Sequence, residues 1–353
     1  MLSDTRIAWV DVARGLAIAL VVLHHAIQRC VAAGAAGEWL WITNGLATMR
    51  MPLFFTAAGL FAVKWVLSDR RSWREMVNAK VLLFLWVYVL WVVLRYLWFV
   101  PLPSSDETPA PAVLLSRLWL PDGGWFIYVL ALMFVLAKAA ATFRVPPAVQ
   151  VGLAVVASAV SADDAVATGN PGWDGLLRYT VFFLAAIHGR DLYLRAAMRI
   201  SRPIGCGVVL VWVVAYAGAE RLGVEEEWGV GLALRVAGVC AGVALAVSLS
   251  FSARLANLGR STLPIYMTHQ LLIIPIAGAA GRFYPLSSDP VLSVLSPVLL
   301  AAAVLAVTYW WGRRAGRFHL GWLYAQPRWF ELPRPPRRES SRSGGTRDPG
   351  RLG

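Results

Sequence analysis

Stretches of about twenty apolar residues recur along the whole chain, and they constrain its fold more than any other feature. Hydrophobic residues make up 58% of the sequence and charged residues only 15%, with a mean hydropathy of +0.60. An apolar helix of about 20 residues matches the hydrocarbon thickness of a bilayer. The sequence therefore predicts an all-α, polytopic integral membrane protein of the cell membrane, and it excludes the ordinary soluble enzyme folds.

About ten of these stretches are predicted to be transmembrane helices. They lie near residues 7–31, 43–67, 81–100, 123–142, 146–162, 173–189, 203–219, 229–251, 262–280 and 291–312. We expect residues 1–315 to form one transmembrane domain. Residues 327–353 are rich in Arg, Pro and Ser and poor in apolar residues, so they are predicted to be a disordered basic tail.

The basic residues of the loops indicate how the chain is oriented in the membrane. With ten spans, 23 of the 33 Lys and Arg residues fall on the side of the two termini, and only four fall on the other side. Positive charge is retained in the cytoplasm, so both termini and the basic tail are predicted to be cytoplasmic.

Two other classes of function are not indicated. The net charge of +13 is explained by membrane topology and does not point to nucleic-acid binding. The three cysteines lie far apart without a CxxC pair, so neither a disulfide framework nor a metal site is expected. Nothing in the sequence specifies an oligomeric state.

The first predicted span carries three ionisable side chains on one face. Asp11, Arg14 and His25 fall within about 40° of one direction on a helical wheel, and Arg14 and His25 are about 16 Å apart along the axis. His24 points about 80° away from Arg14 and is not expected to belong to this face. Ionisable groups in a bilayer usually mark a site, so His25 is predicted to accept a proton. A packing role for His25, and simple pairing of Asp11 with Arg14, remain the alternatives.

Further basic residues lie inside other spans, near their predicted outer ends: Arg50, Arg95, Arg178 and Arg235. We expect them to surround one cavity with His25 and to bind an anionic or hydroxyl-rich ligand through their forked donors. The alternative is that each extends separately to lipid headgroups. Lys64 lies near the cytoplasmic end of its span, and its side chain is expected to extend to the lipid headgroups.

Four segments, in order, resemble the membrane-bound acyltransferase 3 family. They read RIAWVDVARGLAIALVVLHHAI, RMPLFFTAAGLF, WFIYVLALMFVL and LGRSTLPIYMTHQLLI, and the resemblance extends to about residue 315. It implies transfer of an acyl group, commonly acetyl, from cytoplasmic acyl-CoA to a hydroxyl of a carbohydrate, a glycan intermediate or a secondary metabolite. Acyl-CoA would be a co-substrate, and no tightly bound cofactor is expected.

The resemblance also implies roles for single residues. His25 matches the catalytic histidine, with Arg14 and Asp11 on the same helix, and Arg71 and Arg74 match a basic pair that would bind the coenzyme.

Other residues are assigned by their place in these motifs. Trp125 and Tyr128 are expected to bind the acceptor together with the four buried arginines. His269 is expected to line the coenzyme channel, with a helix-end hydrogen bond as the open alternative. The alternative function from another class is a transporter or flippase for a glycan or small metabolite, which would use buried arginines equally well.

Overall fold

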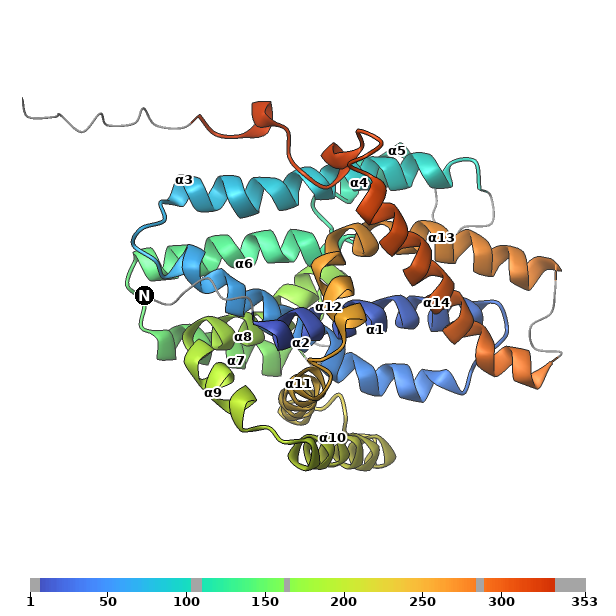
Figure 1. The fold of residues 1–353 in the computed structure, drawn as a ribbon, viewed down its shortest axis with the longest axis horizontal. Coiled ribbons are helices and arrows are strands. Elements are labelled where there is room, and N and C mark those ends of the chain that lie inside the picture. The colour runs from blue at the N-terminus through green and yellow to red at the C-terminus, as the bar shows by residue number, and fades with distance from the viewer. Residues whose placement is uncertain (1–6, 103–109, 162–165, 284–288, 334–353) are drawn as a thin grey trace, which may run out of the picture.

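The computed structural model describes residues 7–102, 110–161, 166–283 and 289–333, and every element in these ranges is helical (Figure 1). In chain order the elements are α1 (Ala8–Ala32), α2 (Trp39–Val66), α3 (Trp73–Met76), the π-helical turn η1 (Val77–Val81), α4 (Leu82–Phe99), α5 (Pro111–Ser116), α6 (Trp125–Thr142), α7 (Pro147–Val160), α8 (Pro171–His188), α9 (Arg190–Arg199), α10 (Arg202–Leu222), α11 (Val230–Ser248), α12 (Ala253–Arg260), α13 (Thr262–Phe283), α14 (Pro290–Arg314), and the short 3-10 turns η4 (Gly321–Leu323) and η5 (Arg328–Phe330).

Eight helices in the described ranges are long and apolar enough to cross a membrane. They are α1, α2, the continuous run formed by α3, η1 and α4, and then α6, α10, α11, α13 and α14. The prediction of an all-α polytopic membrane protein is confirmed. The fifth and sixth predicted spans correspond to α7, which has only 14 residues, and to α8, which is not among the eight. The count of ten and the cytoplasmic placement of both termini stay predictions.

Helix α1 lies at the centre of the bundle, in contact with α2, α11, α12, α13 and α14. Figure 1 shows α4 along one edge of the molecule and α10 along the opposite edge, with α1 between them. This central position explains why α1 is lined with buried small and branched residues on most of its circumference. Side chains on α1 can therefore meet side chains from several other helices.

Two glycines allow α1 and the short helix α12 to cross with their backbones in contact. A Cβ atom on Gly15 would lie 1.9 Å from the carbonyl oxygen of Leu255, and one on Gly259 would lie 1.8 Å from that of Asp11. Only glycine fits at such distances. The crossing brings α12 and the start of α13 against the polar residues near the beginning of α1.

The segment that follows α14 packs along α4. Trp91 Nε1 donates a hydrogen bond to the carbonyl oxygen of Leu323 at 2.9 Å, and the side chain of Asn78 pairs with both backbone groups of Leu332 at 2.9 and 3.1 Å. Leu332, which falls in the segment predicted to be a disordered tail, thus has both of its backbone groups hydrogen-bonded to Asn78. The remainder of the predicted tail, residues 334–353, lies outside the described residues.

Candidate active site

Two cavities of about 380 Å³ each lie on either side of Tyr266, which lines both. The first, here named the Arg14 cavity, is lined by several phenylalanines and by Asp11, Arg14, Lys64, Trp65, Lys80, Thr262 and Tyr266. The second, here named the His25 cavity, is lined by His24, His25, Gln28, Arg29, Arg95, Arg117, Asp122, Trp125, Tyr266, His269 and Gln270. Asp11 and Arg14 of α1 thus line one cavity and His25 lines the other.

In the Arg14 cavity, the buried carboxylate of Asp11 is part of a polar network that links α1, α12 and α13. Asp11 pairs with Arg14 on its own helix at 4.0 Å and with Arg260 of α12 at 3.3 Å. Arg14 also donates to Thr262 Oγ1 at 2.8 Å. The simple pairing of Asp11 with Arg14 is thus present. Lys64, interpreted from the sequence as extending to headgroups, instead lines this cavity with Lys80, which makes its wall basic.

In the His25 cavity, two glutamine side chains contact the imidazole of His25. Its Nδ1 lies 3.1 Å from Gln28 Oε1, and its Nε2 lies 3.1 Å from Gln270 Nε2. Arg95 donates to Gln270 Oε1. A guanidinium can only donate, so the oxygen of the Gln270 amide faces Arg95 and its NH₂ group faces His25.

The orientation of the Gln270 amide bears on which ring nitrogen of His25 carries the proton. The Gln270 nitrogen lies 3.1 Å from Nε2 and 3.4 Å from Nδ1 of this ring, and Gln28 Oε1 lies 3.1 Å from Nδ1. These contacts favour the neutral tautomer with its proton on Nδ1 and its lone pair on Nε2, because an oxygen can accept the Nδ1 proton and the amide NH₂ is nearer to Nε2. In this tautomer the Nε2 lone pair of His25 can accept a proton, and the ring lines the His25 cavity.

Two more imidazoles adjoin His25. The rings of His24 and His269 each have their centroid 5.1 Å from that of His25. His24 Nδ1 is hydrogen-bonded to Thr43 Oγ1 at 2.8 Å, and His269 Nδ1 donates to the carbonyl oxygen of Ile265 at 3.1 Å. His24, which the helical wheel places away from the face of Asp11, Arg14 and His25, lines the same cavity as His25. Among the described residues no group of side chains is suited to hold a metal ion.

His269 lies in the interior, only 2% exposed, and lines the His25 cavity. Its helical hydrogen bond to Ile265 matches the alternative reading of this residue. Its Nε2 atom is buried and has no hydrogen-bond partner among the described residues. Unsatisfied buried nitrogens of this kind are rare in proteins and often belong to functional sites.

The four arginines predicted to share a cavity with His25 are separated in the structure. Arg95 lines the His25 cavity. Arg50, 7% exposed, donates to the backbone carbonyl of Thr43, the residue whose hydroxyl holds His24. Arg178 donates to the carbonyl oxygen of Ser161 at 2.9 Å, and Arg235 pairs with Glu226 at 3.5 Å. Neither Arg178 nor Arg235 is among the residues that line the cavity.

The two aromatic residues assigned to the acceptor also differ in position. Trp125 lines the His25 cavity, with its ring against the backbone of Gly175 on α8, where a Cβ atom would lie 2.5 Å away. Tyr128, one turn further along α6, packs against Tyr88 and Trp173 instead. Trp125 alone of the pair faces the cavity.

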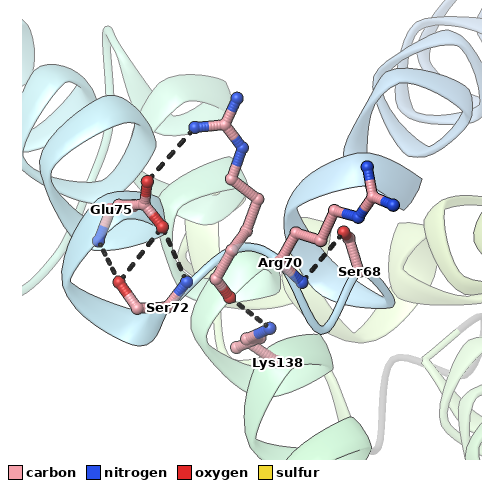
Figure 2. A network of polar contacts seen from close by, with 6 residues as sticks. Ser68, Arg70, Ser72, Glu75 and Lys138 are labelled. Carbon is pink, nitrogen blue, oxygen red and sulfur yellow. Dashed lines mark hydrogen bonds and ion pairs between the residues drawn. The ribbon is translucent and has the colours of Figure 1, made fainter. Parts of the chain in front are cut away.

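The loop that carries Arg71 and Arg74 is held in one conformation by a small polar network (Figure 2). Ser72 caps α3 in a capping box with Glu75, and Arg71 pairs with Glu75 at 3.3 Å. Lys138 of α6, 8% exposed, donates to the carbonyl oxygens of Val66 and Arg71, both at 3.2 Å. A single ammonium group thus ties the two ends of the loop to α6.

This loop adjoins the Arg14 cavity through one aromatic ring. The guanidinium of Arg71 lies 4.9 Å from the centre of the Trp65 ring, and the ammonium of Lys80 lies 5.4 Å from it. Trp65 and Lys80 line the Arg14 cavity. The side chain of Arg74 is exposed on α3.

Reasoning from the sequence missed Tyr266 and Gln270, although a sequence pattern could have revealed them. Tyr266, His269 and Gln270 are spaced i, i+3 and i+4 within one helix and therefore share a face. The same spacing that drew attention to Asp11 and Arg14 would have grouped these three residues.

Comparison with known proteins supports an enzyme. The family model described as an acyltransferase domain matches residues 7–312, which include both cavities and most of the described helices. A search of curated proteins and a search of solved structures each gave no match. The chain belongs to the acyltransferase 3 family of membrane-bound acyltransferases.

Proposed function

We propose that the protein is an O-acyltransferase of the cell membrane that moves an acyl group, most simply acetyl, from cytoplasmic acyl-CoA to a hydroxyl group. The acceptor would be a carbohydrate, a glycan intermediate or a secondary metabolite. The observation that carries this proposal is the pair of cavities on either side of Tyr266, one with a basic wall and one with the unprotonated imidazole of His25. A transferase brings two substrates together beside its catalytic base, and the two adjoining cavities offer one binding space for each substrate.

The Arg14 cavity suits the coenzyme. Its basic lining by Lys64 and Lys80 complements the phosphates of coenzyme A, and the stacked side chains of Trp65 and Arg71 offer a surface for its adenine ring. The loop charges of the chain favour a cytoplasmic position for this end of α1, the compartment that holds acyl-CoA. Arg74, exposed beside Arg71, would make a further phosphate contact.

The His25 cavity suits the acceptor and the chemical step. The hydroxyl oxygen attacks the thioester carbonyl carbon while His25 Nε2 takes the hydroxyl proton, so that the carbon–oxygen bond forms and the carbon–sulfur bond breaks. The departing sulfur then receives the proton from His25. Arg95 and Gln270, on the same cavity wall, supply N–H donors for the oxyanion.

In this reaction the side chain of Gln270 must move away from His25 Nε2 before the acceptor hydroxyl can form a hydrogen bond with that nitrogen. The bond between Gln270 and His25 is therefore a property of the resting enzyme, and acceptor binding replaces it with the hydrogen bond of a hydroxyl group.

The test combines a deletion strain with the purified protein. Detergent extract of the deletion strain supplies unmodified acceptor, and acetyl-CoA labelled in its acetyl group supplies the donor. Transfer of label into an ester only when the protein is added supports the proposal, and mass spectrometry of the labelled product identifies the acceptor. Movement of a glycan or metabolite across vesicles without any ester formation would instead support a transporter.

A further inference from the structure

We propose that residues 321–333, here named the strap, position Lys80 for the coenzyme by holding the π-helical turn η1. This inference rests on the proposed function, in which acyl-CoA binds in the Arg14 cavity. It assigns a role to a segment that follows the residues matched by the family model.

The turn η1 presents one of its residues to the coenzyme cavity. Lys80 is half-buried and lines the Arg14 cavity, with its ammonium 5.4 Å from the centre of the Trp65 ring. The backbone of Val77–Val81 is π-helical, whereas the α4 residues that follow are α-helical. Short π-helical turns of this kind are rare and frequently occur at functional sites. The conformation of η1 determines where the Lys80 ammonium lies in the cavity.

The same turn presents a second residue to the strap. Asn78 precedes Lys80 by two positions, and side chains two positions apart on a helix point in roughly opposite directions, about 200° apart. The Asn78 side-chain amide donates to the carbonyl oxygen of Leu332 at 3.1 Å and accepts from its backbone N–H at 2.9 Å. The backbone carbonyl oxygen of Asn78 accepts a further hydrogen bond from Gln326 Nε2 at 2.7 Å. Three hydrogen bonds from the strap therefore hold the side of η1 that faces away from the cavity.

The strap is also fastened to α4, so it can serve as a fixed support. Trp86 Nε1 donates to the carbonyl oxygen of Trp322 at 3.0 Å. Trp91 Nε1 donates to that of Leu323 at 2.9 Å. The ring of Trp329 packs edge-on against the ring of Trp86, with 5.3 Å between their centroids. These contacts lie along α4, the helix that continues directly from η1 (Figure 1).

The contacts to Asn78 give the strap a role beyond covering α4. The tryptophan contacts alone would hold the segment on α4, yet three further hydrogen bonds go to one residue of η1, two positions from a lysine of the coenzyme cavity. An ammonium whose backbone is already fixed loses less conformational freedom when it binds a phosphate. The strap therefore raises the affinity of the Arg14 cavity for the phosphates of coenzyme A.

Two donors separate phosphate binding from the rest of the reaction. Transfer is measured with acetyl-CoA and with S-acetylpantetheine, which has the same thioester but no phosphate, and deletion-strain extract supplies the acceptor. Lys80→Met is expected to raise the KM for acetyl-CoA about tenfold, because a phosphate loses a charged hydrogen bond. The KM for S-acetylpantetheine should not change.

Variants of the strap contact should reproduce this selective effect. Gln326→Leu removes the bond to the Asn78 carbonyl, and Asn78→Ala removes the two bonds to Leu332. Each is expected to raise the KM for acetyl-CoA severalfold, with kcat and the KM values for S-acetylpantetheine and the acceptor unchanged. Lys80→Met combined with Gln326→Leu should show the KM of Lys80→Met alone, because the strap acts through Lys80.

Gln150→Leu is the matched control. Gln150 Nε2 also donates to a backbone carbonyl at 2.7 Å, that of Val145, and Gln150 does not line the Arg14 cavity. Its KM for acetyl-CoA should equal that of the wild type.

Each contrary outcome has one meaning. Equal KM values for acetyl-CoA in Gln326→Leu, Asn78→Ala and Gln150→Leu would overturn the inference and leave acyl transfer intact. So would a KM for S-acetylpantetheine that rises as much as that for acetyl-CoA, or effects of Lys80→Met and Gln326→Leu that multiply in the double variant. A wild-type protein that transfers no acetyl group from either donor would overturn the proposed function itself, and the inference with it.

Discussion

The side-chain amide of Gln270 contacts the imidazole of His25, with 3.1 Å between their Nε2 atoms, although the two residues are 245 positions apart in the sequence. The contact joins α1 to α13. It also favours the tautomer in which the lone pair of His25 is on Nε2, because Arg95 holds the amide oxygen on the opposite side.

Replacing Gln270 with Leu is expected to lower kcat at least about tenfold, because the oxyanion loses one of its two proposed N–H donors. The KM for acyl-CoA should stay unchanged, since Gln270 does not line the Arg14 cavity. Steady-state kinetics with labelled acetyl-CoA provide the measurement. Gln150→Leu is a matched control, because Gln150 makes a similar contact to His188 on α8, away from the site. Equal kcat values for the two variants would remove Gln270 from the catalytic site.

Replacing Lys138 with Met is expected to raise the KM for acyl-CoA severalfold and to leave the KM for the acceptor unchanged. The substitution removes the two hydrogen bonds that hold the Arg71 loop and keeps most of the buried volume. It should also cost about 1–3 kcal/mol of stability, because two carbonyl groups lose their donor. Arg199→Met removes a charge from an exposed site on α9 and should change neither quantity. A lower stability with an unchanged KM for acyl-CoA would limit Lys138 to a purely structural role.

Replacing Gly259 with Ala is expected to destabilise the protein by about 1–3 kcal/mol, because the added methyl group meets the backbone of Asp11 and forces α12 away from α1. Gly207→Ala on α10 is the control, since a Cβ atom there meets nothing within 4 Å. That change should be neutral or slightly stabilising, as alanine favours a helix. Thermal unfolding in detergent measures both, and a Gly259→Ala protein as stable as Gly207→Ala would contradict the close crossing.

The orientation of the chain is tested by reporter fusions. Reporters placed after residues 75, 195 and 345 should indicate the cytoplasm, and reporters after residues 108 and 225 the opposite side, because loop arginines and lysines are retained in the cytoplasm. A cytoplasmic signal after residue 225 would require a different number of spans, with α7 and α8 as the elements to reconsider.

The sequence predicted the helical membrane architecture well, because long apolar runs and loop charges report directly on the bilayer. It also placed Asp11, Arg14 and His25 correctly as polar residues of one helix, since helical geometry is local. It did not predict that His269 lies beside His25, nor that Arg235 pairs with Glu226. Those facts depend on how distant helices pack, and a single sequence carries no record of such contacts.

The central claim, that His25 is the base of an acyl transfer, is tested most directly by the kcat of His25→Ala and His25→Gln for transfer of labelled acetyl from acetyl-CoA. We expect both variants to fold, to bind acyl-CoA, and to lose about 10²- to 10⁴-fold in kcat, because glutamine preserves hydrogen bonding but cannot take a proton. His24→Ala, with its ring equally near but held by Thr43, should lose less. Near-normal transfer by well-folded His25→Ala protein would contradict the account.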